Sequence, residues 1–129
     1  MTTKKPNNAD KREVYKKQDF NTYIIWRSLP SMMKGQPRHI LEKMGIDDDS
    51  VLSLLEIKNQ AEFAQRFGIK DATTLSEWNK RIDEEDMIPK INAWARKLTP
   101  NVTFALYRTA RKYGKAAEVK AWYELVEGM

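Results

Sequence analysis

Apolar side chains recur every three or four residues along most of this chain, which is the spacing of one face of an α-helix. The first such segment carries Phe20, Tyr23 and Ile24, begins with Asp19 as its expected N-cap and ends at Pro30. No segment alternates apolar and polar side chains for long, so a β-sheet is not expected. The pattern therefore predicts an all-α fold.

Capping residues and helix breakers divide the rest of the chain into short helices. Asn59 is an expected N-cap, Gly68 ends a helix, and either Asp71 or Thr73 caps the next one. The segment from Val51 to Ile57 fits a helix or a strand by its apolar spacing alone. The predicted helices after the first cover approximately residues 37–44, 60–67, 72–82, 87–98, 101–113 and 115–127.

The composition allows a hydrophobic core but offers little for catalysis. Hydrophobic residues make up 41% of the 129 residues, and the chain has no cysteine and a single histidine, His39. These facts exclude disulfides, thiol nucleophiles and a zinc site of the usual ligand count. Asp47–Asp49 lacks the ligand spacing of a calcium loop, and four successive helical carboxylates at Asp83–Asp86 point in different directions. We therefore expect no enzymatic activity, no metal and no cofactor.

The N-terminal region is polar. Residues 1–17 are rich in lysine and predict a flexible basic tail, without the apolar middle of a signal peptide. No apolar run approaches the roughly 18 residues that a membrane span needs. We therefore expect a cytoplasmic protein with no membrane partner.

The charges are unevenly distributed along the chain. The formal net charge is +5, but between Lys90 and Lys120 eight cations meet a single carboxylate, Glu118, which gives this stretch a charge of +7. One interpretation is an ordinary solvated helix face. The other is that some of these cations contact DNA phosphates beside a DNA-binding helix, namely Arg108, Arg111, Lys112 and Lys115.

Residues 59–81 have the features of a helix-turn-helix. Ala64 is small enough for two helices to cross closely, and Gly68 tolerates the positive φ that the turn needs. The side chains expected to face inward are Phe63, Phe67, Ile69, Leu75 and Trp78. The outward surface then carries hydrogen-bonding and charged groups that suit base edges in the major groove: Thr73, Thr74, Ser76, Glu77, Asn79, Lys80 and Arg81.

This segment resembles a known family. Q-A-E-F-A-Q-R-F-G-I at residues 60–69, followed by T-L-S-E-W at 74–78, is similar to the homeodomain-like helix-turn-helix of phage DNA-binding proteins, including terminase small subunits and insertion-element proteins. The aromatic residues 23–30 resemble the helix before this motif, and residues 104–125 resemble the C-terminal helical hairpin. The resemblance implies a DNA-binding domain at 18–86, with an insertion near 37–57, and a C-terminal helical region at 87–129.

The resemblance implies non-catalytic binding of double-stranded DNA in a bacterial or phage-infected cell. The leading role is that of a terminase small subunit, which recognises DNA for packaging with a large ATPase subunit. A transcriptional repressor or an insertion-element accessory protein is an alternative, and a protein–protein adaptor is an alternative of another class. We expect contacts to base edges from Thr73, Ser76, Glu77 and Lys80, contacts to the DNA backbone from Gln60, Lys70 and Arg81, and Thr74 on the same surface.

The C-terminal hairpin carries more large apolar side chains than two short helices need for their own core. They are Phe104, Tyr107, Trp122, Tyr123 and Leu125. Because one helix-turn-helix offers few base contacts, specific binding usually needs several copies. We expect the hairpin, residues 101–127, to join copies into a homo-oligomer, unless the helix at 87–98 covers the surplus within one chain.

Overall fold

The computed structural model describes residues 19–128, and these residues form helices and no strand. The all-α prediction is confirmed, while the predicted basic tail at 1–17 lies outside the described residues. A helix at residues 19–28 comes first. It is followed by η1 (Ser31–Met33), α2 (Arg38–Lys43), α3 (Asp49–Leu55), α4 (Gln60–Arg66), α5 (Ala72–Glu84), α6 (Ile88–Ala95), α7 (Pro100–Tyr113) and α8 (Ala116–Glu127).

Side-chain caps explain where α3, α4 and α5 begin. Asp48 accepts hydrogen bonds from the backbone amides of Ser50 and Val51, so the ambiguous segment after it is the helix α3 and not a strand. Asn59 caps α4 as predicted, and Asp71 caps α5. The expected cap of the first helix is wrong, because Asp19 is already helical.

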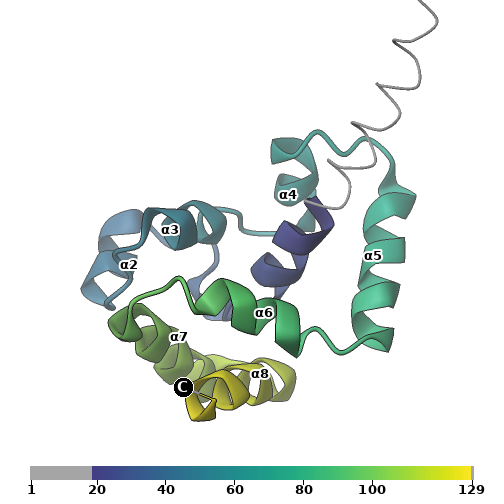
Figure 1. The fold of residues 1–129 in the computed structure, drawn as a ribbon. Coiled ribbons are helices and arrows are strands. Elements are labelled where there is room, and N and C mark those ends of the chain that lie inside the picture. Colours follow the sequence, from purple (N-terminus) through teal and green to yellow (C-terminus); the bar gives the residue numbers. More distant parts are fainter. Residues whose placement is uncertain (1–18, 129) are drawn as a thin grey trace, which may run out of the picture.

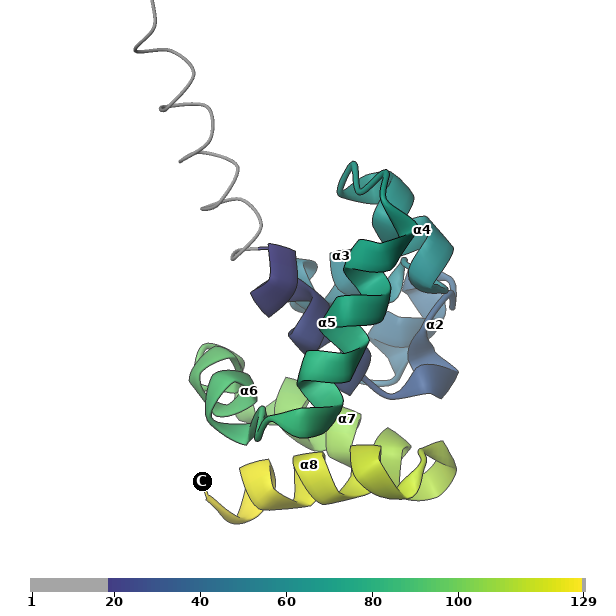
Figure 2. The same cartoon turned by 90° about the vertical axis from the view of Figure 1, so that its right-hand side faces the viewer.

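The helices are arranged in two parts that share one core. In Figure 1 the helix at 19–28 lies in the upper part beside α4 and α5, while α7 and α8 form the layer at the bottom. Figure 2 shows the same separation, with α5 facing the viewer and α8 lying below it. α8 packs against α6 and α7, and η1 packs against α7.

The upper part is held by an aromatic cluster around the fully buried Tyr23. Its ring centroid lies 5.0 Å from that of Phe63 on α4 and 5.6 Å from that of Trp78 on α5. The ring of Phe20 also lies 5.6 Å from Trp78. Aromatic pairs in this range of distances stabilise a core beyond the burial of their area. The first helix therefore positions both α4 and α5.

Two tryptophans and one glutamate join the first helix and η1 to more distant segments. The indole Nε1 of Trp122 on α8 donates to the Ser28 carbonyl over 2.8 Å, and that of Trp26 donates to the Ile57 carbonyl over 2.9 Å. The carboxylate of Glu118 accepts from the Ser31 amide at 3.2 Å and the Lys115 amide at 3.1 Å. The C-terminal hairpin is thus fastened to the start of the fold.

The structure divides the large side chains of the hairpin into two groups. Trp122 and Leu125 are buried in the hydrophobic cluster that extends from Phe20 along the chain. Tyr107 is partly buried against the same cluster, whereas Phe104 and Tyr123 are exposed. The hairpin therefore covers the rest of the chain with some of its apolar side chains and leaves others at the surface.

We predict that Trp78→Ala destabilises the fold by about 3–5 kcal/mol, because it removes a large side chain that is 7% exposed and packed on Phe20 and Tyr23. Chemical denaturation measures the difference. The neighbouring exposed Glu77→Ala serves as control and changes stability by no more than about 0.5 kcal/mol. Equal stability of the two variants would show that the inward face of α5 is assigned wrongly.

Candidate nucleic-acid interface

The turn between α4 and α5 depends on a glycine for its backbone conformation. Gly68 has φ of +68°, in the left-handed region, and a Cβ there would meet no atom within 4 Å. The requirement is therefore conformational and not a matter of space. Next to it, the amide of Ile69 donates to the Ala64 carbonyl over 2.8 Å, which closes the end of α4.

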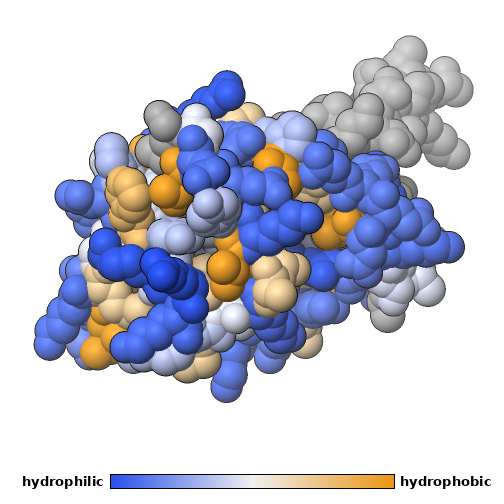
Figure 3. All heavy atoms as spheres, turned by 90° about the horizontal axis from the view of Figure 1, so that it is seen from below, coloured by the Kyte–Doolittle hydropathy of each residue, from blue (hydrophilic) through white to orange (hydrophobic). Residues whose placement is uncertain are grey.

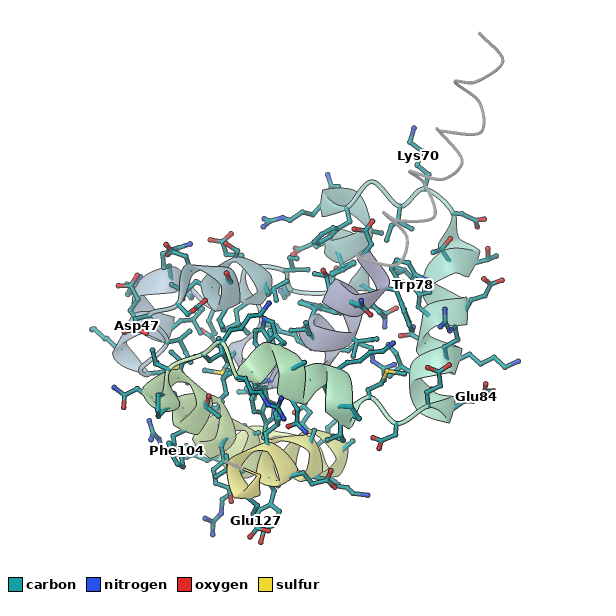
Figure 4. The ribbon with its side chains drawn as sticks, in the orientation of Figure 1. Asp47, Lys70, Trp78, Glu84, Phe104 and Glu127 are labelled. Carbon is teal, nitrogen blue, oxygen red and sulfur yellow. The ribbon has the colours of Figure 1, made fainter. Side chains whose placement is uncertain are left out.

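The inward face of α5 is the one that the sequence predicts. Leu75 and Trp78 are 9% and 7% exposed, and Ile82 is partly buried against the same cluster. Figure 4 shows Trp78 on the side of α5 that faces the first helix. Because these positions share one side of the helix, the opposite side is turned to solvent.

Asn79 is not on the outward surface, and that prediction is wrong. Its Oδ1 accepts from the hydroxyl of Tyr23 at 2.7 Å and from Nη1 of Arg27 at 3.2 Å. Its Nδ2 donates to Oε1 of Gln60 on α4 at 3.4 Å. One half-buried carboxamide thus connects α5 to the first helix and to α4.

The pKa of Tyr23 reflects these surroundings. Burial raises the pKa of the phenol above its usual value, and the Arg27 guanidinium and the hydrogen bond to Asn79 oppose this effect. The usual pKa of a phenol is already well above neutral pH, and the shift raises it further, so the hydroxyl is protonated near neutral pH. It is therefore a donor to Asn79.

The outward side of α5 carries an exposed stripe of Thr73, Ser76, Glu77 and Lys80, spaced three or four residues apart. Among the described residues, the side chains of Ser76, Glu77 and Lys80 make no hydrogen bond or ion pair. The Thr73 hydroxyl instead donates to Asp71 at 2.7 Å. Three of the four residues predicted to contact bases are therefore exposed and uncommitted, which means that their side chains have no polar partner within the described residues.

The other predicted site residues lie around this stripe. Lys70 is exposed in the turn and points away from the fold (Figure 4). The Arg81 guanidinium lies over the Phe20 ring, 4.3 Å from its centroid, and 3.8 Å from the carboxylate of Glu85. Thr74 is partly buried. Gln60 is exposed, but its side-chain oxygen accepts the bond from Asn79.

The two ends of α5 differ in charge. Carboxylates gather at the C-terminal end, where Asp83 lies 3.5 Å from Arg27 and Asp86 accepts the Ile88 amide. Glu84 is exposed at the same end (Figure 4). Residues 83–86 are four successive carboxylates, so a polyanion is disfavoured there, and the part of α5 before Asp83 is the part that could approach it.

The most perturbed lysine lies elsewhere in the fold. Burial lowers the pKa of Lys34 to about 8, while Glu118 opposes that shift and the nearby cations Arg27 and Lys115 add to it. Its Nζ lies 4.2 Å from the Trp26 ring centroid. Lys34 belongs to the junction between the first helix and α8, and not to the α5 surface.

The cations after Lys90 form a surface separate from the α5 stripe. Both ribbon views place α7 and α8 in a layer below α5. The ion pairs of the described chain lie between residues 27 and 85, so none of them neutralises the cations of α6, α7 or α8. The cations of α7 and α8 do not extend the stripe, whereas Lys90 of α6 lies over the Phe20 ring that Arg81 of α5 also covers.

The residues described by the structure contain no group of three or more His, Asp or Glu that could hold a metal ion. In the same part of the chain, no helix has the length and apolar content needed to cross a membrane. No family model, curated protein or solved structure matches the chain.

The spacing of Asn79 from Leu75 along α5 is a sequence signal for an inward position. Asn79 comes four residues after Leu75, so it lies on the same side of α5 as a buried residue. That spacing could have placed it inward, but nothing in the sequence points to Tyr23, which lies 56 residues earlier, as its partner.

We predict that Asn79→Ala lowers stability by about 1–3 kcal/mol, because it leaves the buried Tyr23 hydroxyl without an acceptor. In the Tyr23→Phe background that hydroxyl is gone, so the same substitution is less damaging. A double-mutant cycle by denaturation measures the coupling. Strictly additive losses would contradict the role given to this hydrogen bond.

Proposed function

We propose that this protein binds double-stranded DNA without catalysis, using α4, the turn and α5 as a helix-turn-helix. The observation that carries the proposal is the exposed stripe of Thr73, Ser76, Glu77 and Lys80 on a helix whose opposite side is buried. Hydroxyl, carboxylate and ammonium groups in this arrangement suit the donor and acceptor pattern of base edges in the major groove.

The charge of α5 favours one orientation on DNA. The part of α5 before Asp83, with Ser76 and Lys80 and the nearby Lys70, enters the groove, while the carboxylates near Glu84 stay away from the phosphates. In helix-turn-helix proteins the N-terminal residues of the second helix commonly contact the bases. Support for this orientation comes from the separation of charge along α5.

Within DNA binding, we propose the role of a terminase small subunit, with a large ATPase subunit as its partner. The support is the resemblance of residues 60–69 and 74–78 to the motif of phage proteins. A transcriptional repressor or an insertion-element accessory protein would use the same surface. Assembly into a ring favours packaging, whereas a dimer favours a repressor.

More than one copy is proposed to act at one DNA site. A single α5 offers few base contacts, and each good bidentate contact discriminates by about 1–3 kcal/mol. Specific binding usually needs a preference of a thousandfold or more over random DNA. The proposed partners are therefore duplex DNA and further copies of this chain.

We predict that duplex binding weakens steeply with salt. Each neutralised phosphate adds about −0.9 to the slope of log K against log salt concentration. Fluorescence anisotropy with a labelled duplex over a salt series measures this slope. A protein–protein adaptor on the same scaffold gives no such binding, so absence of duplex binding at low salt would favour the adaptor and contradict the proposal.

We further predict that substitutions distinguish residues that contact bases, and so determine sequence preference, from residues that contact only phosphates. Lys80→Ala and Glu77→Ala change which sequences are enriched from a random duplex pool, because both side chains are exposed and uncommitted on α5. Lys70→Ala removes a charge in the turn and weakens all sequences alike. Unchanged sequence preference in the Lys80 and Glu77 variants would refute their assignment as base readers.

A further inference from the structure

The outer side of the α7–α8 hairpin exposes aromatic rings. Phe104 on α7 is 43% exposed and Tyr123 on α8 is 48% exposed. The half-buried Tyr107 follows Phe104 by three residues on α7, and its ring centroid lies 6.5 Å from that of Tyr123. Together with the cations described next, these rings form what we call the hairpin face.

Cations lie among these rings. Arg108 and Arg111 follow Phe104 by four and seven residues, so they share its side of α7, and Lys120 precedes Tyr123 by three residues on α8. All three are exposed, and none is in an ion pair within the described residues. Glu127 accepts from the Tyr123 hydroxyl at 2.7 Å and keeps its negative charge, and Glu124 is exposed on the same side of α8. Three cations therefore face two carboxylates, and because both carboxylates lie on α8, the positive charge is concentrated on α7.

The surroundings of the hairpin face are also polar. Seen from below, where α7 and α8 face the viewer, apolar residues form separate patches among hydrophilic ones (Figure 3). A second copy docked with its α7 on this α7 would bring Arg108 and Arg111 of two chains together, and α7 has no carboxylate to pair with them. Like charges placed opposite one another disfavour such an interface. The occupant that fits best is an anion with flat apolar groups.

We propose that the hairpin face binds single-stranded nucleic acid. Its cations match the phosphates of the strand, and the exposed rings of Phe104 and Tyr123 offer faces on which bases can stack. Proteins that bind single strands without sequence preference combine these two elements. Bases in an intact duplex are stacked on one another, so the rings have no access to them there. The proposal does not depend on duplex binding by α5.

The test uses the full chain and a labelled oligo(dT) of roughly 20 nucleotides, which exceeds the length of one site. Fluorescence anisotropy at low salt measures its affinity. The double variant Phe104→Ala/Tyr123→Ala weakens binding by about tenfold or more, since it removes two stacking rings. Arg111→Gln also weakens binding, and it reduces the salt slope by about 0.7 for one lost phosphate contact.

Tyr113→Ala is the matched control. Tyr113 is an aromatic residue of α7 that is 50% exposed, and it lies about two and a half turns beyond Phe104, on the opposite side of the helix. Its removal leaves oligo(dT) affinity unchanged. Thermal unfolding checks that the variants keep the fold.

Several results would overturn the proposal. One is no binding of oligo(dT) at low salt, and another is equal affinity of wild type and the double aromatic variant. A loss on Arg111→Gln alone, with duplex and oligo(dT) competing equally, would mark a surface for phosphates without stacking. Light scattering that shows oligomers dissociating in the double aromatic variant would assign the face to a second copy of the chain.

Discussion

The hydrogen bond from the Tyr23 hydroxyl to the Asn79 carboxamide fixes how α5 is rotated about its axis. A buried phenol needs an acceptor, and here the acceptor lies one residue after Trp78, whose ring packs on the same tyrosine. Polar and aromatic contacts thus hold one side of α5 against the first helix. Because the helical period is fixed, Ser76, Glu77 and Lys80 must then face solvent, and the proposed DNA surface follows from this core contact.

The molecule separates its charges by layer. In the upper part the arginines are engaged, as Arg27 is with Asp83 and Arg81 with Glu85, while Lys80 is in no ion pair among the described residues. In the lower layer the cations of α7 and α8 have no carboxylate partner among the described residues. An exposed charge without a partner is well hydrated and available to a ligand, whereas a paired charge must first give up its partner. Two surfaces of different chemistry result, one with hydrogen-bonding groups on α5 and one with rings and cations on the hairpin.

Local signals in the sequence predicted most of the helices, because caps and apolar spacing act within a few residues. Asn59 and Gly68 mark the limits of α4 as the structure has them, and Trp78 is buried as its spacing from Leu75 indicates. Long-range partners were not predictable in this way. The bond from Trp122 to Ser28 joins residues 94 apart, and Asn79 meets Tyr23 only because three helices converge. The spacing of residues within the chain indicates which side of α5 faces solvent, but it does not indicate which ligand binds there.

The most direct test of the central claim is a titration of the ¹⁵N-labelled chain with a mixed-sequence DNA duplex, followed by amide and indole chemical shifts. Assignment of α5 to the groove predicts that the amides of Thr73, Ser76, Glu77 and Lys80 shift as DNA is added. The indole of Trp78, buried on the opposite side, keeps its position. Shifts confined to α7 and α8, with α5 unchanged, would contradict the account and place duplex binding on the hairpin instead.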